Sequence, residues 1–410
     1  MRDVLYVSGS RADYGPAREV LQSIQTSPRL RLSILVTGMH LDPLHGETWR
    51  EIAADGFIIA ARVPGRLACD SLAAMAGSVG LYLYGMSEAI ERIRPDIVLV
   101  LGDRGEQLAA AMAAAFQNTV VVHLCGGSLS GSIDDSIRHA ITKFAHYHLP
   151  ACEEHAQRII QMGEDPATVR VVGLPGGDIR PDATLSRSAV CAELGIPGGR
   201  PYVLVVQHSV SQSHHAARGQ IIETLEAVAA LGHHTLLADP NDDAGGRAIL
   251  AEMRAYSARY PHLHILPATG SRERFASIMA HAGVLVGNSS CSIAEAMSAG
   301  LPAVNIGDRQ RGREHLACLL NVGYDRAEIA RAIQLALEDH EYRKSVAEFV
   351  SPLIRDTPRA VTNVLENLDL SVPTHPKAFV DLVREATPEP RPGGKQSASE
   401  SGFLRTSSGP

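Results

Sequence analysis

Short apolar runs alternate along this chain with longer segments in which apolar residues recur every three to four positions. The first pattern is typical of strands and the second of amphipathic helices. Because the short runs are almost continuously apolar, we expect strands buried on both faces, as in parallel sheets covered by helices. The sequence predicts two series of strands, at residues 4–8, 32–37, 97–101, 120–123 and 169–172, and at residues 202–206, 235–238, 264–266, 284–287 and 303–306.

An irregular stretch rich in glycine and proline separates the two series. It begins with Gly173-Leu174-Pro175-Gly176-Gly177 and ends with Pro197-Gly198-Gly199. Such residues interrupt regular structure. We therefore predict an α/β protein with two Rossmann-like domains at residues 1–175 and 200–370, whose parallel sheets face each other across a cleft, joined by a hinge at 176–199. The segment 371–410 is rich in Pro, Ser and Gly and is predicted to be a disordered tail.

Length and composition are compatible with two cores, since the chain has 410 residues and is 45% hydrophobic. Its formal net charge is -7 and its Lys and Arg residues are scattered, so we expect neither a nucleic-acid nor a membrane partner. Its apolar runs stay short of the roughly 20 residues that span a bilayer, and Met1-Arg2-Asp3-Val4 leads into a strand instead of a signal sequence. We expect a soluble, cytoplasmic protein.

The six cysteines are far apart and form neither a C-x-x-C pair nor a zinc-type cluster with histidine. We interpret them as free thiols and expect no structural metal and no cofactor.

Polar residues follow the first-domain strands, where open parallel sheets bind their ligands. Residues 9–15 form a turn into a helix whose amides, together with Arg11, suit a phosphate. A plain strand-to-helix turn is an equally good interpretation. Asp103 follows the third strand and is a candidate catalytic carboxylate, although capping of the helix at Glu106 explains it as well.

The fourth strand leads into a dense group of charges at Asp134, Asp135, Arg138 and His139. Two carboxylates beside such cations are in environments that push their pKa values apart. We expect one of the two to cap the helix that starts near Ser136, which leaves the other free for chemistry.

In the second domain, His208 ends a strand at the predicted cleft, although a lone histidine is more often structural. Gly287-Asn288-Ser289-Ser290 leads into a predicted helix at 291–299 that carries Glu295. Hydroxyls and free amides at a helix N-terminus suit a diphosphate, and Glu295 could accept from ribose hydroxyls. A serine N-cap is the plainer interpretation, but Arg313, after the next strand, adds a cation beside this segment.

The motifs together resemble the hydrolysing UDP-N-acetylglucosamine 2-epimerases of sialic-acid-type pathways, from residue 3 to about residue 350. The similar segments are residues 9–15, 102–104, 130–143, 287–291 and 307–313. The resemblance implies a GT-B fold that closes over a nucleotide sugar. It also implies two groups of site residues: Arg11, Ser289, Ser290, Glu295 and Arg313 at the nucleotide and diphosphate, and Asp103, Asp134 and His208 as catalytic residues at the sugar.

Three positions depart from the family pattern. Ser128 stands where the family has glutamate, Ser209 where it has proline and Ser292 where it has glycine. A serine cannot replace a carboxylate in proton transfer, whereas cleavage of the bond from sugar to diphosphate needs only stabilisation of the leaving charge.

These departures favour a glycosyltransferase that moves a sugar from a UDP- or GDP-linked donor to a small acceptor, with a thiol among the options. Such an enzyme would resemble the S-glycosyltransferases of lincosamide antibiotic pathways and act as a homodimer in secondary metabolism. Three alternatives stay open: a hydrolysing 2-epimerase that gives N-acetylmannosamine and UDP, with Asp135 or water replacing the missing carboxylate; a nucleotide-sugar hydrolase; and a non-catalytic sensor of nucleotide sugars.

Overall fold

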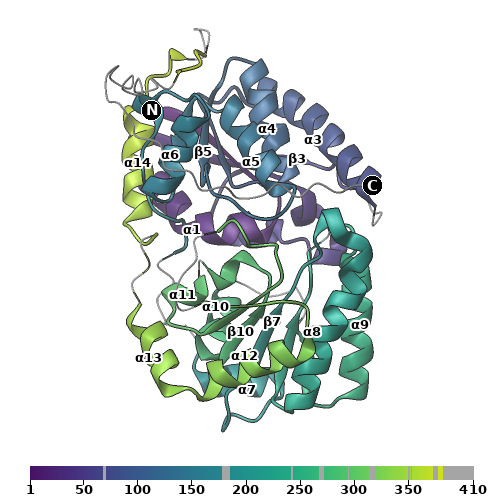
Figure 1. Ribbon diagram of the computed structural model, residues 1–410. Helices are drawn as coiled ribbons and strands as arrows, with labels where there is room; N and C mark the ends of the chain where they lie inside the picture. Colours follow the sequence, from purple (N-terminus) through teal and green to yellow (C-terminus); the bar gives the residue numbers. More distant parts are fainter. Residues whose placement is uncertain are drawn as a thin grey trace, which may run out of the picture. The chain divides into compact units, whose positions relative to one another are not determined.

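Two six-stranded parallel sheets organise the protein. The computed structural model describes residues 1–67, 71–177, 185–241, 243–266, 272–293, 295–313, 319–349, 351, 353–372 and 377–381. The first sheet has the strand order β3-β2-β1-β4-β5-β6 and the second has the order β12-β11-β10-β7-β8-β9 (Figure 1). The predicted α/β architecture with two parallel sheets is confirmed.

The strands agree closely with the apolar runs. The first sheet contains β1 (Arg2–Ser8), β2 (Leu30–Thr37), β3 (Ile59–Val63), β4 (Ile97–Leu101), β5 (Val120–Leu124) and β6 (Tyr147–Leu149). The second contains β7 (Val203–Val206), β8 (Thr235–Ala238), β9 (Leu263–Leu266), β10 (Val284–Gly287), β11 (Ala303–Ile306) and β12 (Leu319–Val322).

Edge strands account for the errors in the predicted sheets. The strand expected at 169–172 is wrong, because only Val169 forms a bridge, with His148 at the outer side of β6. The sequence reading missed β3, β6 and β12, each at the edge of a sheet. Strands at edges are short and exposed on one side, so the continuous apolar pattern of central strands fades there.

Helices cover the faces of both sheets. Those that follow first-sheet strands are α1 (Arg11–Thr26), α2 (Trp49–Ala54), α3 (Leu72–Ile93), α4 (Gly105–Phe116), α5 (Asp134–Phe144) and α6 (Glu153–Gln161). The later ones are α7 (Arg187–Leu194), α8 (Ala217–Leu231), α9 (Gly246–Arg259), α10 (Arg272–His281), α11 (Glu295–Ser298), α12 (Arg326–Glu338), α13 (His340–Glu348) and α14 (Thr357–Asn367). Alternate residues of β1 pack on opposite faces of the first sheet, Tyr6 in one core cluster and Val7 in another.

The chain returns to the first sheet after it has completed the second. Helix α14 packs against α1, and its Val361 and Leu365 are buried in the same cluster as Leu21 and Ile24 (Figure 1). The predicted division had placed everything from 200 to 370 in the second domain. Periodicity shows that α14 has an apolar face but not which sheet that face covers.

The predicted hinge and tail are only partly described. Within the hinge at 176–199, Val190, Cys191 and Ile196 are buried in a core cluster of the second sheet, and residues 178–184 lie outside the described residues. At the start of the predicted disordered tail, Lys377 Nζ donates to the carbonyl oxygens of Thr142 and Ala145, at 2.9 and 2.5 Å. This part of the segment therefore packs on the C-terminal end of α5, and residues 382–410 lie outside the described residues.

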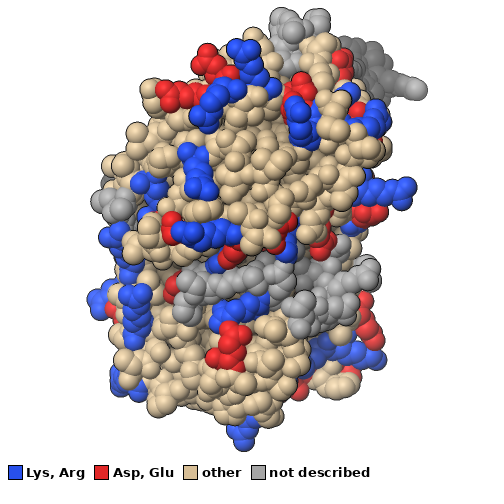
Figure 2. Space-filling model, turned by 180° about the vertical axis from the view of Figure 1, so that it is seen from behind, with Lys and Arg blue, Asp and Glu red and all other residues tan. Residues whose placement is uncertain are grey.

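Several chain-wide features concern the surface and the cysteines. Among the described residues, no helix combines the length and apolar character that crossing a bilayer requires. Basic and acidic side chains lie next to one another on the face shown in Figure 2. Cys125, Cys152, Cys191 and Cys291 are free thiols, and the other two cysteines lie outside the described residues.

Candidate active site

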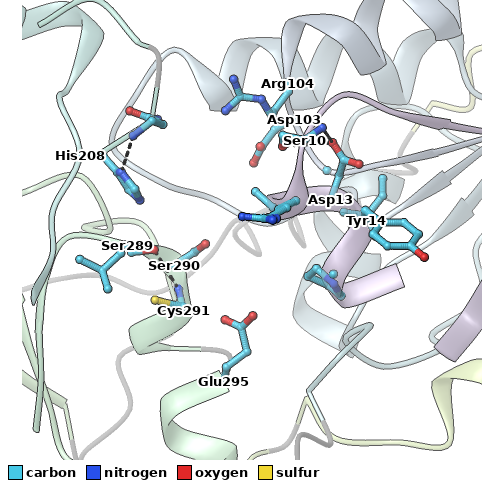
Figure 3. Close-up of a pocket in the computed structure, with 18 of the residues that line it drawn as sticks. Ser10, Asp13, Tyr14, Asp103, Arg104, His208, Ser289, Ser290, Cys291 and Glu295 are labelled. Atoms are coloured by element: carbon cyan, nitrogen blue, oxygen red, sulfur yellow. Dashed lines mark hydrogen bonds between the residues drawn. The ribbon is translucent and has the colours of Figure 1, made fainter. Parts of the chain in front are cut away.

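A cavity of about 470 Å³ opens between the carboxyl ends of the two sheets, a size typical of small-molecule sites. All eight site residues proposed from the sequence line it: Arg11, Asp103, Asp134, His208, Ser289, Ser290, Glu295 and Arg313. Figure 3 shows Asp103 on one side and His208, Ser289, Ser290 and Glu295 on the other. We call Asp103, Asp134 and Arg138 the first wall, and His208, Ser289, Ser290 and Glu295 the second wall. The roles of these residues remain predictions.

A buried arginine organises the first wall. The side chain of Arg138, in α5, is 1% exposed and forms ion pairs with Asp103 and Asp135, the latter at 2.7 Å between Nη1 and Oδ1. The same Nη1 donates to the carbonyl oxygen of Ser128 at 2.8 Å. Asp103 is therefore paired with Arg138 and does not cap α4, whose N-cap is Arg104.

The contacts of Asp134 and Asp135 differ from those that the sequence predicted. Helix α5 starts at Asp134 itself and its N-cap is Ile133, so the prediction that one aspartate caps a helix from Ser136 is wrong. Asp135 Oδ1 instead accepts from the backbone N–H and the hydroxyl of Ser130, at 2.7 and 2.8 Å. Asp134 lines the cavity, with Arg309 Nη2 3.6 Å from its Oδ2.

The pKa values of the two cavity carboxylates move in opposite directions. Burial alone would raise the pKa of Asp103, but Arg138 and Arg313 outweigh it and hold that pKa below its usual range. Burial and the nearby charge of Asp103 both raise the pKa of Asp134. The first wall therefore offers one ionised carboxylate and one that holds a proton more readily, which is the requirement for acid/base chemistry.

On the second wall, His208 is neutral. Its Nδ1 accepts from the backbone N–H of Asn241 at 3.1 Å, so the proton of the neutral ring is on Nε2. Burial, followed by the charges of Arg309 and Arg104, lowers the pKa of His208 to about 3. At neutral pH this ring can therefore donate a hydrogen bond from Nε2.

The predicted helix at 291–299 is confirmed only over residues 295–298. The chain forms a short 3-10 turn at Ser290–Ser292 and then the four-residue helix α11. Ser292 Oγ donates to the carbonyl oxygen of Ser289 at 2.8 Å, a local bond of the kind that competes with α-helical pairing. Ser289 and Ser290 still line the cavity, ahead of a tighter turn than expected.

The two arginines assigned to the diphosphate have partners on the first-sheet side. Arg11 pairs with Glu51. Arg313 Nη1 donates to Ser128 Oγ at 2.6 Å, and its Nη2 lies 3.9 Å from Asp103 Oδ2. Both arginines line the same cavity as Ser289 and Ser290.

The three serines that depart from the family pattern all make hydrogen bonds behind the cavity surface. Ser128 is 2% exposed and lies against Arg313, and Ser209 Oγ donates to the carbonyl oxygen of Ala244 at 2.5 Å. Ser292 bonds Ser289, so each of the three hydroxyls forms a hydrogen bond within the protein. None of the three serines is among the residues that line the cavity. The inference that they mark altered chemistry at the sugar therefore has no support from their positions.

The sequence interpretation left several cavity residues without a role. The pairing of Arg138 could have been predicted from the sequence, because this residue follows Asp135 by three positions on a helix, a spacing that allows an ion pair. Asn241, Phe275 and His155 also line the cavity, and no local pattern singles them out. Within the described part of the chain, no group of three or more His, Cys, Asp or Glu side chains is placed to hold a metal ion.

Comparison with known proteins decides the family. Residues 22–366 match the protein family described as UDP-N-acetylglucosamine 2-epimerase. The chain belongs to this family. Of the motifs that carry the sequence resemblance, those at 102–104, 130–143, 287–291 and 307–313 lie within the matched residues.

Two curated members of the family match most of the chain. The UDP-N,N'-diacetylbacillosamine 2-epimerase (hydrolyzing) of Legionella pneumophila is 39% identical over 346 residues, covering 84% of this chain and 91% of that protein. A UDP-N-acetylglucosamine 2-epimerase of Neisseria meningitidis is 30% identical over 387 residues, covering 93% and 100%.

A solved structure supports the fold. The UDP-GlcNAc 2-epimerase from Neisseria meningitidis bound to UDP-GlcNAc superimposes with a TM-score of 0.72 and 15% identity, covering 89% of this chain and 100% of that one. The predicted GT-B fold is therefore confirmed.

These findings correct the predicted activity. The glycosyltransferase prediction is wrong, because the similar proteins are named as 2-epimerases, one of them explicitly hydrolysing. The resemblance to lincosamide-pathway transferases, and with it a role in antibiotic biosynthesis, is not shown. The epimerase alternative agrees with the comparisons.

Proposed function

We propose that this chain is a hydrolysing 2-epimerase, which converts a UDP-linked 2-acetamido sugar and water into UDP and the free sugar inverted at carbon 2. One observation supports this most directly. An ionised carboxylate and a proton-holding carboxylate, Asp103 and Asp134, line the same cavity as the hydroxyls of Ser289 and Ser290. Acid/base groups and donors for a diphosphate are the two requirements of the reaction.

The reaction has two stages. In the first, the bond from C1 to the diphosphate breaks and the proton leaves C2, giving a double bond between C1 and C2. In the second, water supplies a hydroxyl to C1 and a proton reaches C2 from the opposite face. The sum is hydrolysis of the sugar–diphosphate bond with inversion at C2.

We assign proton exchange at the sugar to Asp134, because it lines the cavity and its raised pKa lets it hold a proton more readily than an ordinary aspartate. Asp103, held ionised by Arg138, stabilises positive charge that develops at the sugar ring. His208 donates from Nε2, and Arg309 and Arg313 supply positive charge for the departing UDP. Ser128 has no part in this scheme.

Two sugars are the candidates, because the relatives are named for them. We propose the UDP-linked diacetylbacillosamine as the first substrate to test, since that relative is 39% identical and the UDP-N-acetylglucosamine relative 30%. We also retain the prediction of a homodimer, which analytical ultracentrifugation would test.

Incubation in D2O with each UDP-sugar tests the proposal. We expect free UDP together with the 2-epimer carrying one deuterium at C2, because the proton returned to C2 comes from solvent. UDP accompanied by sugar of unchanged configuration and without deuterium would mean simple hydrolysis and contradict the proposal. Absence of UDP release from both sugars would contradict it as well.

A further inference from the structure

Asn288 is the first residue after β10, and its side chain is fully buried. Each of its four polar atoms has a partner. Its backbone N–H donates to the carbonyl oxygen of Val206 at 3.2 Å, its Oδ1 accepts from the backbone N–H of His208 at 2.7 Å, and its Nδ2 donates to the carbonyl oxygen of His208 at 2.8 Å. Its own carbonyl oxygen accepts hydrogen bonds from two side chains in the loop after β11, Arg309 and Gln310.

The side chain of Asn288 extends the sheet by one residue. Strands β7 and β10 pair up to Val206 and Gly287, where the backbone ladder ends. Beyond that point the amide group of Asn288 bonds both peptide groups of His208, as a neighbouring strand would. The backbone of His208 is thus held at two points, and its ring at a third by Asn241.

The same residue holds a cation that faces the first wall. The carbonyl oxygen of Asn288 accepts from Arg309 Nη1 at 3.1 Å and from Gln310 Nε2 at 2.9 Å. The other guanidinium nitrogen, Arg309 Nη2, lies 3.6 Å from Asp134 Oδ2. Asn288 therefore contacts His208 directly and, through Arg309, a cation that lies beside Asp134.

We propose that Asn288 is a positioning residue that fixes the hydrogen-bond donor His208 and the cation Arg309 relative to Asp134 in the epimerase reaction, an inference that rests on the proposed function. Asn288 is not among the residues that line the cavity, so it acts through its neighbours and does not touch the sugar. We call the two hydrogen bonds from the Asn288 side chain to the His208 backbone the clamp. Small displacements of catalytic groups reduce rates strongly, so loss of the clamp should lower kcat more than it changes KM.

The Asn288→Asp variant tests the clamp with minimal change of shape. The carboxylate keeps the acceptor for the His208 N–H but places an oxygen against the His208 carbonyl, so we expect kcat to fall about 10- to 100-fold. Backbone bonds to Val206, Arg309 and Gln310 remain, so KM should change less than about threefold.

A pH series makes the test specific. When the new carboxyl group takes up a proton it regains a donor, so the ratio of variant to wild-type kcat should rise at least about fivefold between pH 8 and pH 5.5. Arg309 and Tyr324 are the charged and titratable groups against Asn288, and Arg309 and Arg104 are those near His208. All are common to both proteins, so the ratio cancels their effects.

Asn305→Asp is the matched control. Asn305 is 3% exposed, lies on the neighbouring strand β11 and bonds the side chain of Asn321, away from the cavity residues. We expect it to change stability without a pH-dependent change in kcat. An unchanged kcat in Asn288→Asp, or a fall independent of pH and equal to that of Asn305→Asp, would overturn the proposal.

A measurement without turnover separates this inference from the proposed function. With 13C-labelled histidine, and His208→Gln for assignment, the His208 ring should stay neutral throughout the folded pH range of the wild type. In Asn288→Ala its pKa should move from about 3 towards the 6.5 of an exposed ring, as the released ring reaches solvent. Identical ring titration in both proteins would overturn the clamp, whereas a wild type without turnover but with the shifted variant ring would refute only the proposed reaction.

Discussion

The two walls of the cavity are built on sheets of the same topology, yet they present opposite chemistry. The first wall carries several charges around the buried Arg138, whereas the second presents serine hydroxyls, a neutral histidine ring and one carboxylate, Glu295. Buried charges require partners, and Arg138 pairs with Asp103 and Asp135 within the first domain. Two arginines from the loop after β11, Arg309 and Arg313, add cations beside this wall. Hydroxyls require no such pairing, so Ser290 stays exposed and available to a ligand. The difference suggests proton chemistry on the first wall and nucleotide binding on the second.

The largest effect should come from removal of the cation of the first wall. Arg138→Met removes the buried guanidinium from the partly buried Asp103 and Asp135 and from the carbonyl oxygen of Ser128, so we expect a loss of about 3–5 kcal/mol in the free energy of unfolding measured with urea. Arg218→Met is the control, because Arg218 is an exposed arginine paired with Glu252 and should cost less than about 1 kcal/mol. Equal losses would show that the first wall does not depend on its buried pairs.

If the first wall carries the proton chemistry and the second binds the nucleotide, Asp134→Asn should lower kcat and leave the affinity for UDP nearly unchanged. Its kcat should fall about 10²- to 10⁴-fold, whereas the affinity for UDP measured by calorimetry should change by less than about 1 kcal/mol. Glu153→Gln, an acidic residue in the first turn of α6, serves as control and should affect neither. A large loss of UDP affinity in Asp134→Asn would mean that the first wall also holds the nucleotide.

A substitution in the second wall should instead weaken the affinity for UDP. Ser290→Val removes a hydroxyl that lines the cavity, so UDP affinity should weaken by about 1–3 kcal/mol, whereas Ser290→Thr keeps the hydroxyl and should bind nearly as the wild type. Unchanged affinity in Ser290→Val would place the diphosphate elsewhere.

A smaller effect concerns Asp13, a first-domain carboxyl at the cavity. Burial raises its pKa from 3.8 to about 7, although Ser8 and the backbone N–H of Gly9 donate to it. The folded state therefore binds a proton more tightly than the unfolded state does, so this stability is fully present below pH 3.8 and is lost as the pH rises through 7. Relative to Asp13→Asn, the wild type should lose stability steadily between pH 4 and pH 8 in urea titrations. A difference independent of pH would show that Asp13 is not protonated on folding.

The sequence predicted well those features that depend on local pattern. Central strands are continuous apolar runs, and the residues after them, such as Asp103 and His208, meet at one cavity because parallel strands end at the same edge. Features that depend on distant partners were not predictable. The pairing of Asp103 with Arg138 joins residues 35 apart, and the place of α14 depends on the apolar face of α1.

The serine at 128 shows the limit of reading function from a single substitution. A missing carboxylate suggested a different reaction, but the hydroxyl accepts a hydrogen bond from Arg313, and Asp134, a carboxylate with a raised pKa, lines the cavity. Chemical type alone does not say whether a side chain faces the ligand. That depends on the conformation of the loop between β5 and α5, which the motif does not reveal.

The packing of α14 on α1 also has a consequence for how the molecule is made. A ribosome releases the first sheet early, yet Val361 and Leu365, which complete its core, emerge only after the whole second sheet. Until then the apolar surface of α1 lacks its cover, and the contact that supplies it spans more than three hundred residues, a slow kind of closure. The nascent protein therefore carries an incompletely covered first sheet through most of its synthesis, until α14 packs on α1.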